Sequence, residues 1–151
     1  MGEDIEVHVS DVSPWRREFA ESFGAISHDP ADSESIIEVQ PDLAFDSSGR
    51  QSARELAMRA LSQRGALICV GHGEGLTLDV SRDLIAPERA VLGSEYFRFD
   101  EMPDNLDALR RNRELLSRIV THTYDVTEIR EAFTAFFSGA TGKVVVTQDI
   151  A

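Results

Sequence analysis

The sequence predicts an α/β fold, in which helices cover a parallel sheet and right-handed crossovers join its strands. One observation is that short apolar runs alternate with segments of helical spacing along most of the 151 residues, enough for one domain with a sizeable core. Another is the run ALICV, residues 66–70, which is apolar on both faces of a strand. Such runs are typical of parallel sheets with helices on each side.

The chain opens with an expected strand and an expected helix. The run IEVHVS, residues 5–10, alternates apolar and polar side chains with the period of a strand, and it ends at Asp11. Ser-Pro at 13–14 is a helix cap followed by a first-turn proline, and three aromatic residues follow at helical spacing. Gly24 is suited to end this helix.

Further strands and helices are expected along the rest of the chain. Those before residue 80 are a strand over 41–49 that ends in small polar residues, a helix over 51–65, the buried strand 66–71, a turn at 72–75 and an extended piece at 76–80. Those after it are a brief helix at 81–88, a strand over 89–97, helical spacing over 102–119, an extended piece at 121–126, a helix over 127–139 and a strand over 143–147. Residues 29–36 and 100–105 have the composition of linkers.

Composition argues against several classes of protein. The 27 acidic and 15 basic residues give a net charge of −12, which repels a phosphate backbone, so nucleic acid is a poor candidate partner. No apolar run approaches the roughly 20 residues of a membrane span, and the acidic start is unlike a secretory signal, so we expect a cytoplasmic protein. The single cysteine, Cys69, has no second thiol for a disulfide or a metal site, and we expect a buried small hydrophobe there.

The expected helix near the end of the chain carries an apolar stripe. Its members recur at helical spacing and are Ile129, Ala132, Phe133, Phe136 and Phe137. A stripe of this kind faces a protein core more often than it binds a partner, and we expect it to face the core.

Five pieces of the sequence follow one another in a recognisable order. They are VSDVSPWRREFAESFGA, PDLAFDSSG, RGALICVG, AVLGSEYF and RIVTHTYDVTEIREAFTAFFSGATGKVVV. Together they resemble the carboxyl-terminal part of the zinc-type medium-chain dehydrogenases, which include alcohol, sorbitol and threonine dehydrogenases. The last piece is the most specific, since it is similar to the family's closing motif of a Thr-His strand, a helix with Ala-Phe, a Ser-Gly turn and Gly-Lys before the final strand. The resemblance covers residues 5–147.

The resemblance implies a Rossmann-like doubly wound parallel sheet that lacks its first βα unit, over residues 1–118. A helix–strand tail over 119–151 would follow, which in the family packs on the catalytic domain. In the Rossmann strand order 3-2-1-4-5-6 the first strand lies between the second and the fourth, so its loss splits the sheet. Unpaired strand edges and a bared stripe at Phe133, Phe136 and Phe137 then favour self-association.

The resemblance also gives Asp11 a role, as the acid after the second Rossmann strand that accepts hydrogen bonds from the adenosine ribose. A carboxylate accepts from both ribose hydroxyls and repels the extra phosphate of NADP, so an acid here favours NAD. Arg16 and Arg17 follow one helical turn further on, and the resemblance makes Arg16 the better candidate to lie beside the adenosine end. The alternative interpretation is that Asp11 caps the helix and both arginines are solvated.

The rest of the implied cofactor site lies at strand ends, where doubly wound folds bind their ligands. Two serines end a strand on the adenine and nicotinamide-ribose side, the next strand ends near the nicotinamide, and the last ends near its carboxamide. The implied residues are Ser47, Ser48, Val70, Gly71, His72, Ser94 and Glu95. For the residues at 47–48 and 70–72, the alternative is that they are simply turn residues.

Two parts of a complete dehydrogenase are missing from the sequence. The fingerprint G-x-G-x-x-G should precede the ribose acid by about 20 residues, so it would fall before Met1. The run GHGEG at 71–75 leads into an extended piece rather than a helix, and we interpret it as a turn. The four histidines are scattered and no zinc-ligand spacing exists, so we expect no metal site and no catalytic residue; His122 is expected to be structural.

The sequence therefore predicts a partial NAD-binding domain of a zinc-type alcohol or polyol dehydrogenase. In the complete enzyme the reaction is hydride transfer between an alcohol and NAD, with zinc held by another domain. This chain alone is expected to bind NAD or an adenosine-like ligand weakly and to be inactive. The alternative is a non-enzymatic α/β binding or assembly module derived from a truncated dehydrogenase.

Overall fold

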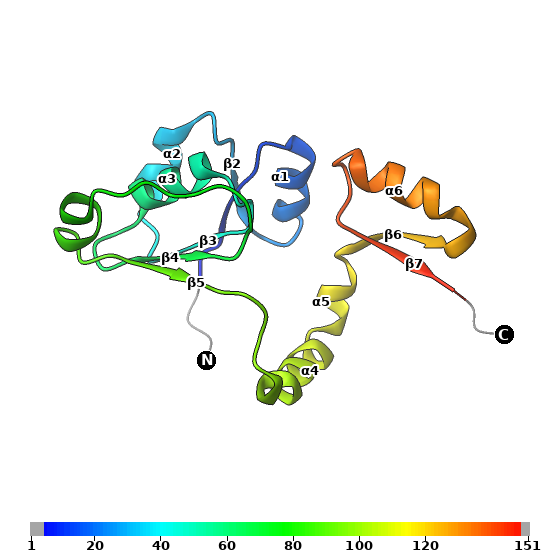
Figure 1. The fold of residues 1–151 in the computed structure, drawn as a ribbon. Coiled ribbons are helices and arrows are strands. Elements are labelled where there is room, and N and C mark those ends of the chain that lie inside the picture. The colour runs from blue at the N-terminus through cyan, green and yellow to red at the C-terminus, as the bar shows by residue number, and fades with distance from the viewer. Residues whose placement is uncertain (1–4, 149–151) are drawn as a thin grey trace. The chain divides into compact units, whose positions relative to one another are not determined.

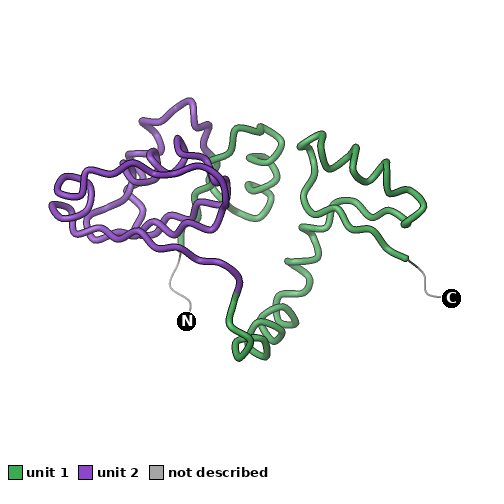
Figure 2. The backbone as a smooth tube through the Cα atoms, viewed as in Figure 1, with its two compact units in different colours: residues 1–27, 97–151 green, residues 28–96 purple. Residues whose placement is uncertain are grey.

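The computed structural model describes residues 5–148 and separates them into two compact units (Figure 2). Residues 28–96 form one unit, and the segments up to residue 27 and from residue 97 form the other. Helices alternate with parallel strands in chain order (Figure 1), so the expected α/β fold is confirmed. Within the described range, no helix combines the length and the apolar character that crossing a membrane requires.

The unit of residues 28–96 is built on a parallel sheet with the strand order β3-β4-β5. Its elements are α2 (Ser33–Val39), β3 (Leu43–Asp46), α3 (Gln51–Ala60), β4 (Ala66–Cys69), the π-helical turn η1 (Val80–Ile85) and β5 (Ala90–Gly93). Parallel neighbours need a crossover, and α3 supplies the one between β3 and β4. Figure 1 shows α2 and α3 on the same side of this sheet.

The core of this unit lies between α3 and the sheet. Leu61 and Leu67 are fully buried, and Met58 joins them. Cys69 packs against this cluster as a small hydrophobe, although it stays partly exposed. Leu84 of the turn η1 also packs against this cluster. Apolar side chains from α3, the sheet and η1 therefore contact one another.

Helix α3 ends earlier than the sequence predicts, at Ala60 rather than near residue 65. The backbone turns extended at Leu61, whose side chain enters the core. The guanidinium of Arg89 takes over the free carbonyls at this helix end: it donates to Met58 O at 2.7 Å, to Ser62 O at 3.0 Å and to Leu61 O. A cation at a helix carboxyl terminus satisfies these carbonyls and complements the helix dipole.

The segments outside residues 28–96 carry the remaining elements, with β2 ending at the boundary. In chain order these are β1 (His8–Ser10), α1 (Pro14–Glu21), β2 (Ile26–His28), η2 (Phe99–Glu101), α4 (Met102–Arg111), α5 (Arg113–Ser117), β6 (Val120–Asp125), η3 (Val126–Glu128), α6 (Ile129–Phe137) and β7 (Lys143–Thr147). β6 and β7 are parallel neighbours, and α6 connects them and contacts both (Figure 1). The final strand has the bounds that the sequence predicts.

The strands form the separate sheets that the Rossmann order predicts when strand 1 is missing. β1 pairs with β2, which corresponds to the pair 2 and 3 of that order, and β3, β4 and β5 correspond to 4, 5 and 6. Among the described residues, β3 has a strand neighbour on one side, β4, and ends the sheet on the other. Its apolar residues Leu43 and Phe45 are 59% and 69% exposed.

Three elements were not predicted from the sequence: β2, α2 and the short turn η2 (Phe99–Glu101). β2 has three residues, too few to show a period, and α2 begins within residues 29–36, which have the composition of a linker. The polar residues there start the helix, because Asp32 accepts a hydrogen bond from the Ser35 amide at 3.3 Å as its cap. The linker interpretation of residues 29–36 is therefore wrong.

The apolar stripe of α6 does not face a core within the described residues. Ala132 is 3% exposed, whereas Phe133 and Phe136 are each 55% exposed and Phe137 is 76% exposed. The rings contact one another instead, with centroids 6.0 Å apart for Phe133 and Phe137 and 5.4 Å apart for Phe136 and Phe137. The expectation of a core-facing stripe is therefore wrong. The exposure of Phe133, Phe136 and Phe137 that the family resemblance implies is confirmed.

Candidate cofactor site

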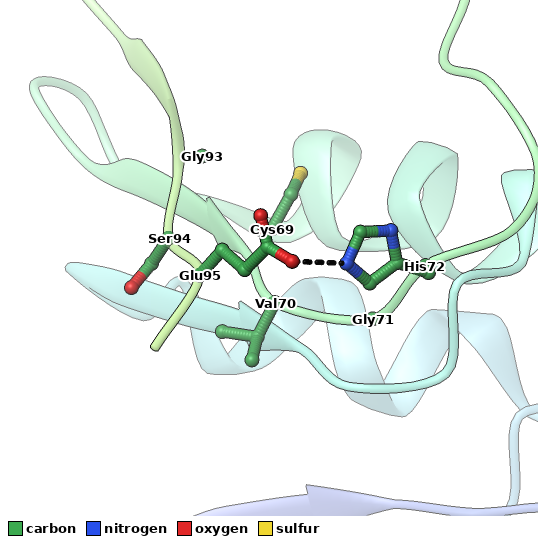
Figure 3. Close-up of a pocket in the computed structure, with 7 residues that line it drawn as sticks. All are labelled: Cys69, Val70, Gly71, His72, Gly93, Ser94 and Glu95. Carbon is green, nitrogen blue, oxygen red and sulfur yellow. Dashed lines mark ion pairs between the residues drawn. The ribbon is translucent and has the colours of Figure 1, made fainter. Parts of the chain in front are cut away.

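The carboxyl ends of β4 and β5 form a pocket of about 350 Å³ (Figure 3). Cys69 and Gly93 are register partners at the ends of the two strands, and the chain continues from both into the pocket wall. The lining residues are Cys69, Val70, Gly71, His72, Gly93, Ser94 and Glu95. Five residues of the predicted cofactor site, those at 70–72 and 94–95, thus lie around one cavity.

Two side chains of opposite potential charge face each other across this pocket. Figure 3 shows the carboxylate of Glu95 turned toward the His72 ring, with Oε1 3.3 Å from Nε2. Both side chains are largely exposed, so the pair contributes little to stability and attracts only when His72 is protonated. A backbone bond from the Ser94 amide to Cys69 O, 3.0 Å long, extends the sheet to the pocket edge.

The turn after β3 brings Ser47 and Ser48 to the neighbouring strand end. The hydroxyl of Ser48 donates to Asp46 Oδ1 at 2.7 Å and accepts from the Arg50 amide at 3.1 Å. Its amide also donates to Asp46 Oδ1, at 2.9 Å. Ser48 is therefore occupied in shaping the turn, and Ser47 is exposed beside it.

The turns after β3 and β4 meet backbone to backbone, which requires glycine at both. A Cβ on Gly49 would lie 1.9 Å from His72 O, and Gly49 has a φ of +69°, in the left-handed region. A Cβ on Gly71 would lie 2.4 Å from Gly49 N and 2.6 Å from the carbonyl carbon of Ser47. Close approach thus places the 70–72 wall of the pocket directly against the 47–49 turn.

Sequence reasoning missed the ion pair beneath these turns. Arg54 of α3 and Asp46 at the end of β3 are buried, with Nε 2.7 Å from Oδ2. Burial alone raises the pKa of Asp46, but hydrogen bonds from Ser48, Arg54 and Gly49 outweigh that effect and hold the pKa below its usual value. The sequence held a signal of the burial of Arg54, though not of its partner, since Arg54 lies four and seven residues before the core residues Met58 and Leu61 and so shares their side of the helix.

The GHGEG segment is a turn, as predicted, and it contributes a carboxylate rather than an anion site. Glu74 accepts from the Gln51 amide at 2.8 Å, at the first residue of α3, and from Arg50 Nη1 at 2.8 Å. These two hydrogen bonds lower the pKa of Glu74. Because a carboxylate already occupies this helix amino terminus, a phosphate group would be repelled there.

Asp11 and Arg16 lie in the unit that contains β1 and α1. Oδ1 of Asp11 accepts from the Ser13 amide at 2.8 Å, and Oδ2 lies 3.7 Å from Arg16 Nη1. The backbone carbonyl of Asp11 accepts from Arg17 Nη1 at 2.7 Å. These are the contacts of a turn-forming acid, as the capping interpretation requires, yet the Asp11 side chain stays 26% exposed and has further lone pairs for ribose hydroxyls.

Metal-binding chemistry has no counterpart in the part of the chain that the structure describes. No group of three His, Cys, Asp or Glu side chains gathers there in a way that could hold an ion. His122 bonds the hydroxyl of Thr121 at 2.9 Å and stacks on Tyr124, with centroids 6.3 Å apart. Its contacts are those of a structural histidine.

Comparison with known proteins places the chain among dehydrogenases. The profile of the zinc-binding dehydrogenase family matches residues 1–111. An L-threonine 3-dehydrogenase of Ruegeria pomeroyi is 33% identical over 108 residues, which are 70% of this chain and 31% of that protein. An uncharacterized zinc-type alcohol dehydrogenase-like protein of Escherichia coli, YphC, is 25% identical over 144 residues, 90% of this chain and 41% of that protein.

Solved dehydrogenase structures share the fold. A 2R,3R-butanediol dehydrogenase of Bacillus subtilis superposes with a TM-score of 0.83 at 24% identity, over 95% of this chain and 44% of that one. An Escherichia coli alcohol dehydrogenase in complex with NADH superposes with a TM-score of 0.79 at 21% identity, over 94% and 44%. This chain thus spans less than half the length of the relatives it matches. With the family profile matching well over half of its residues, the chain belongs to the zinc-binding dehydrogenase family.

Proposed function

We propose that this chain is part of the NAD-binding domain of a zinc-type alcohol or polyol dehydrogenase. The observation that carries the proposal is the pocket at the ends of β4 and β5, around which residues 70–72 and 94–95 converge. Ligands of doubly wound folds bind at this edge of the sheet. In such an enzyme, bound NAD accepts a hydride from the alcohol carbon while zinc polarises the alcohol oxygen.

The chain's own residues would bind and orient the two ends of the dinucleotide. Val70, Gly71 and His72 would form the wall beside the nicotinamide, and Ser94 and Glu95 would lie near its carboxamide. Ser47 and Ser48 would border the ribose side. Asp11 would accept hydrogen bonds from the adenosine ribose, with Arg16 beside it. The assignment of residues 1–118 to this domain and of 119–151 to a tail remains a prediction.

On this proposal the chain alone should bind NAD weakly and catalyse no turnover. The negative carboxylate of Glu74 takes the amino terminus of α3, and no glycine fingerprint is among the residues to bind a pyrophosphate. We expect no reduction of NAD with alcohols or polyols, with or without added zinc, in a spectrophotometric assay at 340 nm. Turnover above background by purified protein would contradict the proposal.

Binding of the adenosine end tests the role of Asp11. A carboxylate hydrogen bond contributes about 1.5–3 kcal/mol, so Asp11→Ala should weaken adenosine or NAD binding about 10- to 100-fold in calorimetric or NMR titrations. NADP should bind more weakly than NAD, because its extra phosphate meets the carboxylate.

Two matched variants separate ligand binding from turn formation. Asp11→Asn keeps an oxygen for the Ser13 amide but removes the charge, so it should retain the fold and lose the preference for NAD over NADP. Asp29→Ala removes a carboxylate with the same local geometry, since Asp29 Oδ1 accepts from the Ala31 amide at 2.9 Å, and should leave affinity unchanged. Equal affinities for Asp11→Ala and the wild type would remove Asp11 from the site.

The alternative of a non-enzymatic binding or assembly module makes a different prediction. Such a module would associate with itself or a partner while binding no nucleoside. Titration with NAD and adenosine that shifts no amide signal near residue 11, 70–72 or 94–95 would favour this alternative.

A further inference from the structure

Arg54 makes three hydrogen bonds that tie together two turns far apart in the sequence. Nε donates to Asp46 at the end of β3, at 2.7 Å. Nη2 donates to Gly71 O at 2.5 Å, and Nη1 donates to Glu74 O. One guanidinium on α3 therefore holds the end of β3 and the segment that follows β4.

A second set of contacts closes this arrangement into a ring. The amide of Glu74 donates to Gly49 O at 2.7 Å, and its carboxylate binds the Gln51 amide and Arg50 at 2.8 Å each. Both turns and the start of α3 are thus linked by backbone and side-chain bonds. Among the described residues, every buried side-chain polar atom has a hydrogen-bond partner, so the network is complete.

The burial of this ion pair indicates a role in orienting the backbone rather than in stability alone. The side chains of Arg54 and Asp46 are 10% and 3% exposed, and moving two charges out of water costs several kcal/mol for each. Well-packed apolar residues at such positions are often as stabilising as the ion pair. What apolar residues cannot do is fix the directions of two carbonyl groups, at Gly71 and Glu74.

The carbonyl of Gly71 belongs to the pocket wall, and that of Glu74 follows two residues after the wall ends at His72. Val70, Gly71 and His72 line the cavity, and the Gly71 carbonyl is held by Arg54 on the side of α3. The Val70 and Gly71 amides both donate to Asp46 O, at 2.8 Å each. Both peptide groups around Gly71 therefore have fixed orientations, and so has this wall.

We propose that Arg54 and Asp46 are positioning residues of the cofactor site, which hold residues 70–74 against the turn after β3 so that the pocket is formed before its ligand binds. This inference rests on the proposed function for its ligand, the nicotinamide half of NAD. Neither side chain lines the pocket, so both act through the segment that they hold. Preorganisation of this kind lowers the entropy cost of binding.

The test compares Arg54→Met with Arg59→Met in the full 151-residue chain. Arg59 is exposed on the same helix, so its variant matches the change in volume and charge without touching the network. Hydrogen exchange of the amides of residues 70–74 should accelerate about 10-fold or more in Arg54→Met, while amides 67–69 of β4 keep their protection. Affinity for nicotinamide riboside should fall about 10-fold by NMR titration.

A conservative variant distinguishes positioning from general stability. Arg54→Lys keeps the charge but reaches fewer of the three acceptors, because an ammonium lacks the planar fork of arginine. It should restore the overall thermal midpoint while residues 70–74 stay loosened and binding stays weak. Full recovery of exchange and affinity by lysine would mean that the charge alone matters, which overturns the positioning role.

Unchanged exchange at 70–74 in a folded Arg54→Met protein overturns the inference. If that variant does not fold, Glu74→Gln on the exposed rim takes its place and must loosen residues 71–75 and weaken binding; no change overturns the inference. If the wild type binds no nicotinamide riboside or NAD while the exchange results are as expected, the proposed function fails, but the role of Arg54 and Asp46 in holding residues 70–74 is supported.

Discussion

Replacing Gly49 by alanine should separate the two turns beside the candidate cofactor site, those after β3 and β4. The new Cβ would lie 1.9 Å from His72 O, whereas real Cβ atoms essentially never approach other atoms within 3.0 Å. The turns must therefore separate by about 1 Å or more. The bond from the Glu74 amide to Gly49 O, now 2.7 Å long, would then exceed 3.5 Å and be lost.

The strained backbone and the lost hydrogen bonds set the expected loss of stability in Gly49→Ala. Alanine at a φ of +69° costs about 1 kcal/mol, and each lost hydrogen bond costs about 0.5–1.5 kcal/mol. With the Glu74 bond and one Arg54 bond lost, we expect a loss of about 2–4 kcal/mol in the free energy of unfolding of residues 28–96. Urea unfolding followed by circular dichroism measures this loss.

Gly75, in the segment that follows β4, offers a matched control for Gly49→Ala. A Cβ on Gly75 would meet nothing within 4 Å, and its φ lies outside the left-handed region, so Gly75→Ala should change stability by less than about 0.5 kcal/mol. If Gly49→Ala is as stable as Gly75→Ala, the backbone contact between the turns is absent in solution, and the account of the pocket wall that depends on it must be abandoned.

Three other outcomes are expected. Because Asp46 has a lowered pKa when folded, its contribution to stability is present above the unfolded pKa of about 4 and is lost as the pH falls through the lower folded pKa. Asp46→Asn should therefore reduce the dependence of the urea unfolding midpoint on pH between about pH 5 and 3. A midpoint that depends on pH as strongly as in the wild type would refute this. Arg89→Met should cost about 1–3 kcal/mol in urea unfolding, because it leaves three carbonyls at the end of α3 without their donor, and a neutral result would show that water replaces it. The chain should self-associate more as the salt concentration rises, because salt screens the repulsion between chains of net charge −12 and lets the exposed rings of Phe133, Phe136 and Phe137 on different molecules come into contact. Light scattering that gives a monomer mass at every salt concentration would contradict this.

Much of the fold was predictable because its signals are local. The run 143–147 contains three valines and a threonine, which are β-branched, and it forms β7 with the predicted bounds. Ser13 and Pro14 begin α1 as expected, where the Ser13 hydroxyl accepts from the Arg16 amide at 3.4 Å. Elements shorter than a full period, such as β2, give no such signal, because three residues fit either a strand or a loop.

The candidate site was predictable where topology alone determines it. Carboxyl ends of neighbouring parallel strands meet at one edge of a sheet, so residues after β4 and β5 had to come together. The network of Asp46, Arg54 and Glu74 was not predictable in this way. Its members are 8 and 20 residues apart, and charged residues usually lie on the surface, so the pattern gives no reason to pair them.

If the proposed function holds, the charges around the pocket favour one part of a dinucleotide over another. Arg50 and Arg54 lie beside the turns after β3 and β4, and both form ion pairs, Arg50 with Glu74 and Arg54 with Asp46. Glu95 adds a carboxylate at the pocket itself. A phosphate beside Glu95 would therefore meet a carboxylate and, among the described residues of these turns, no free guanidinium, whereas the positively charged ring of oxidised nicotinamide would be attracted to that carboxylate. It follows that nicotinamide riboside should bind at least as well as its phosphorylated form, and that the phosphates of NAD need groups other than these for their binding.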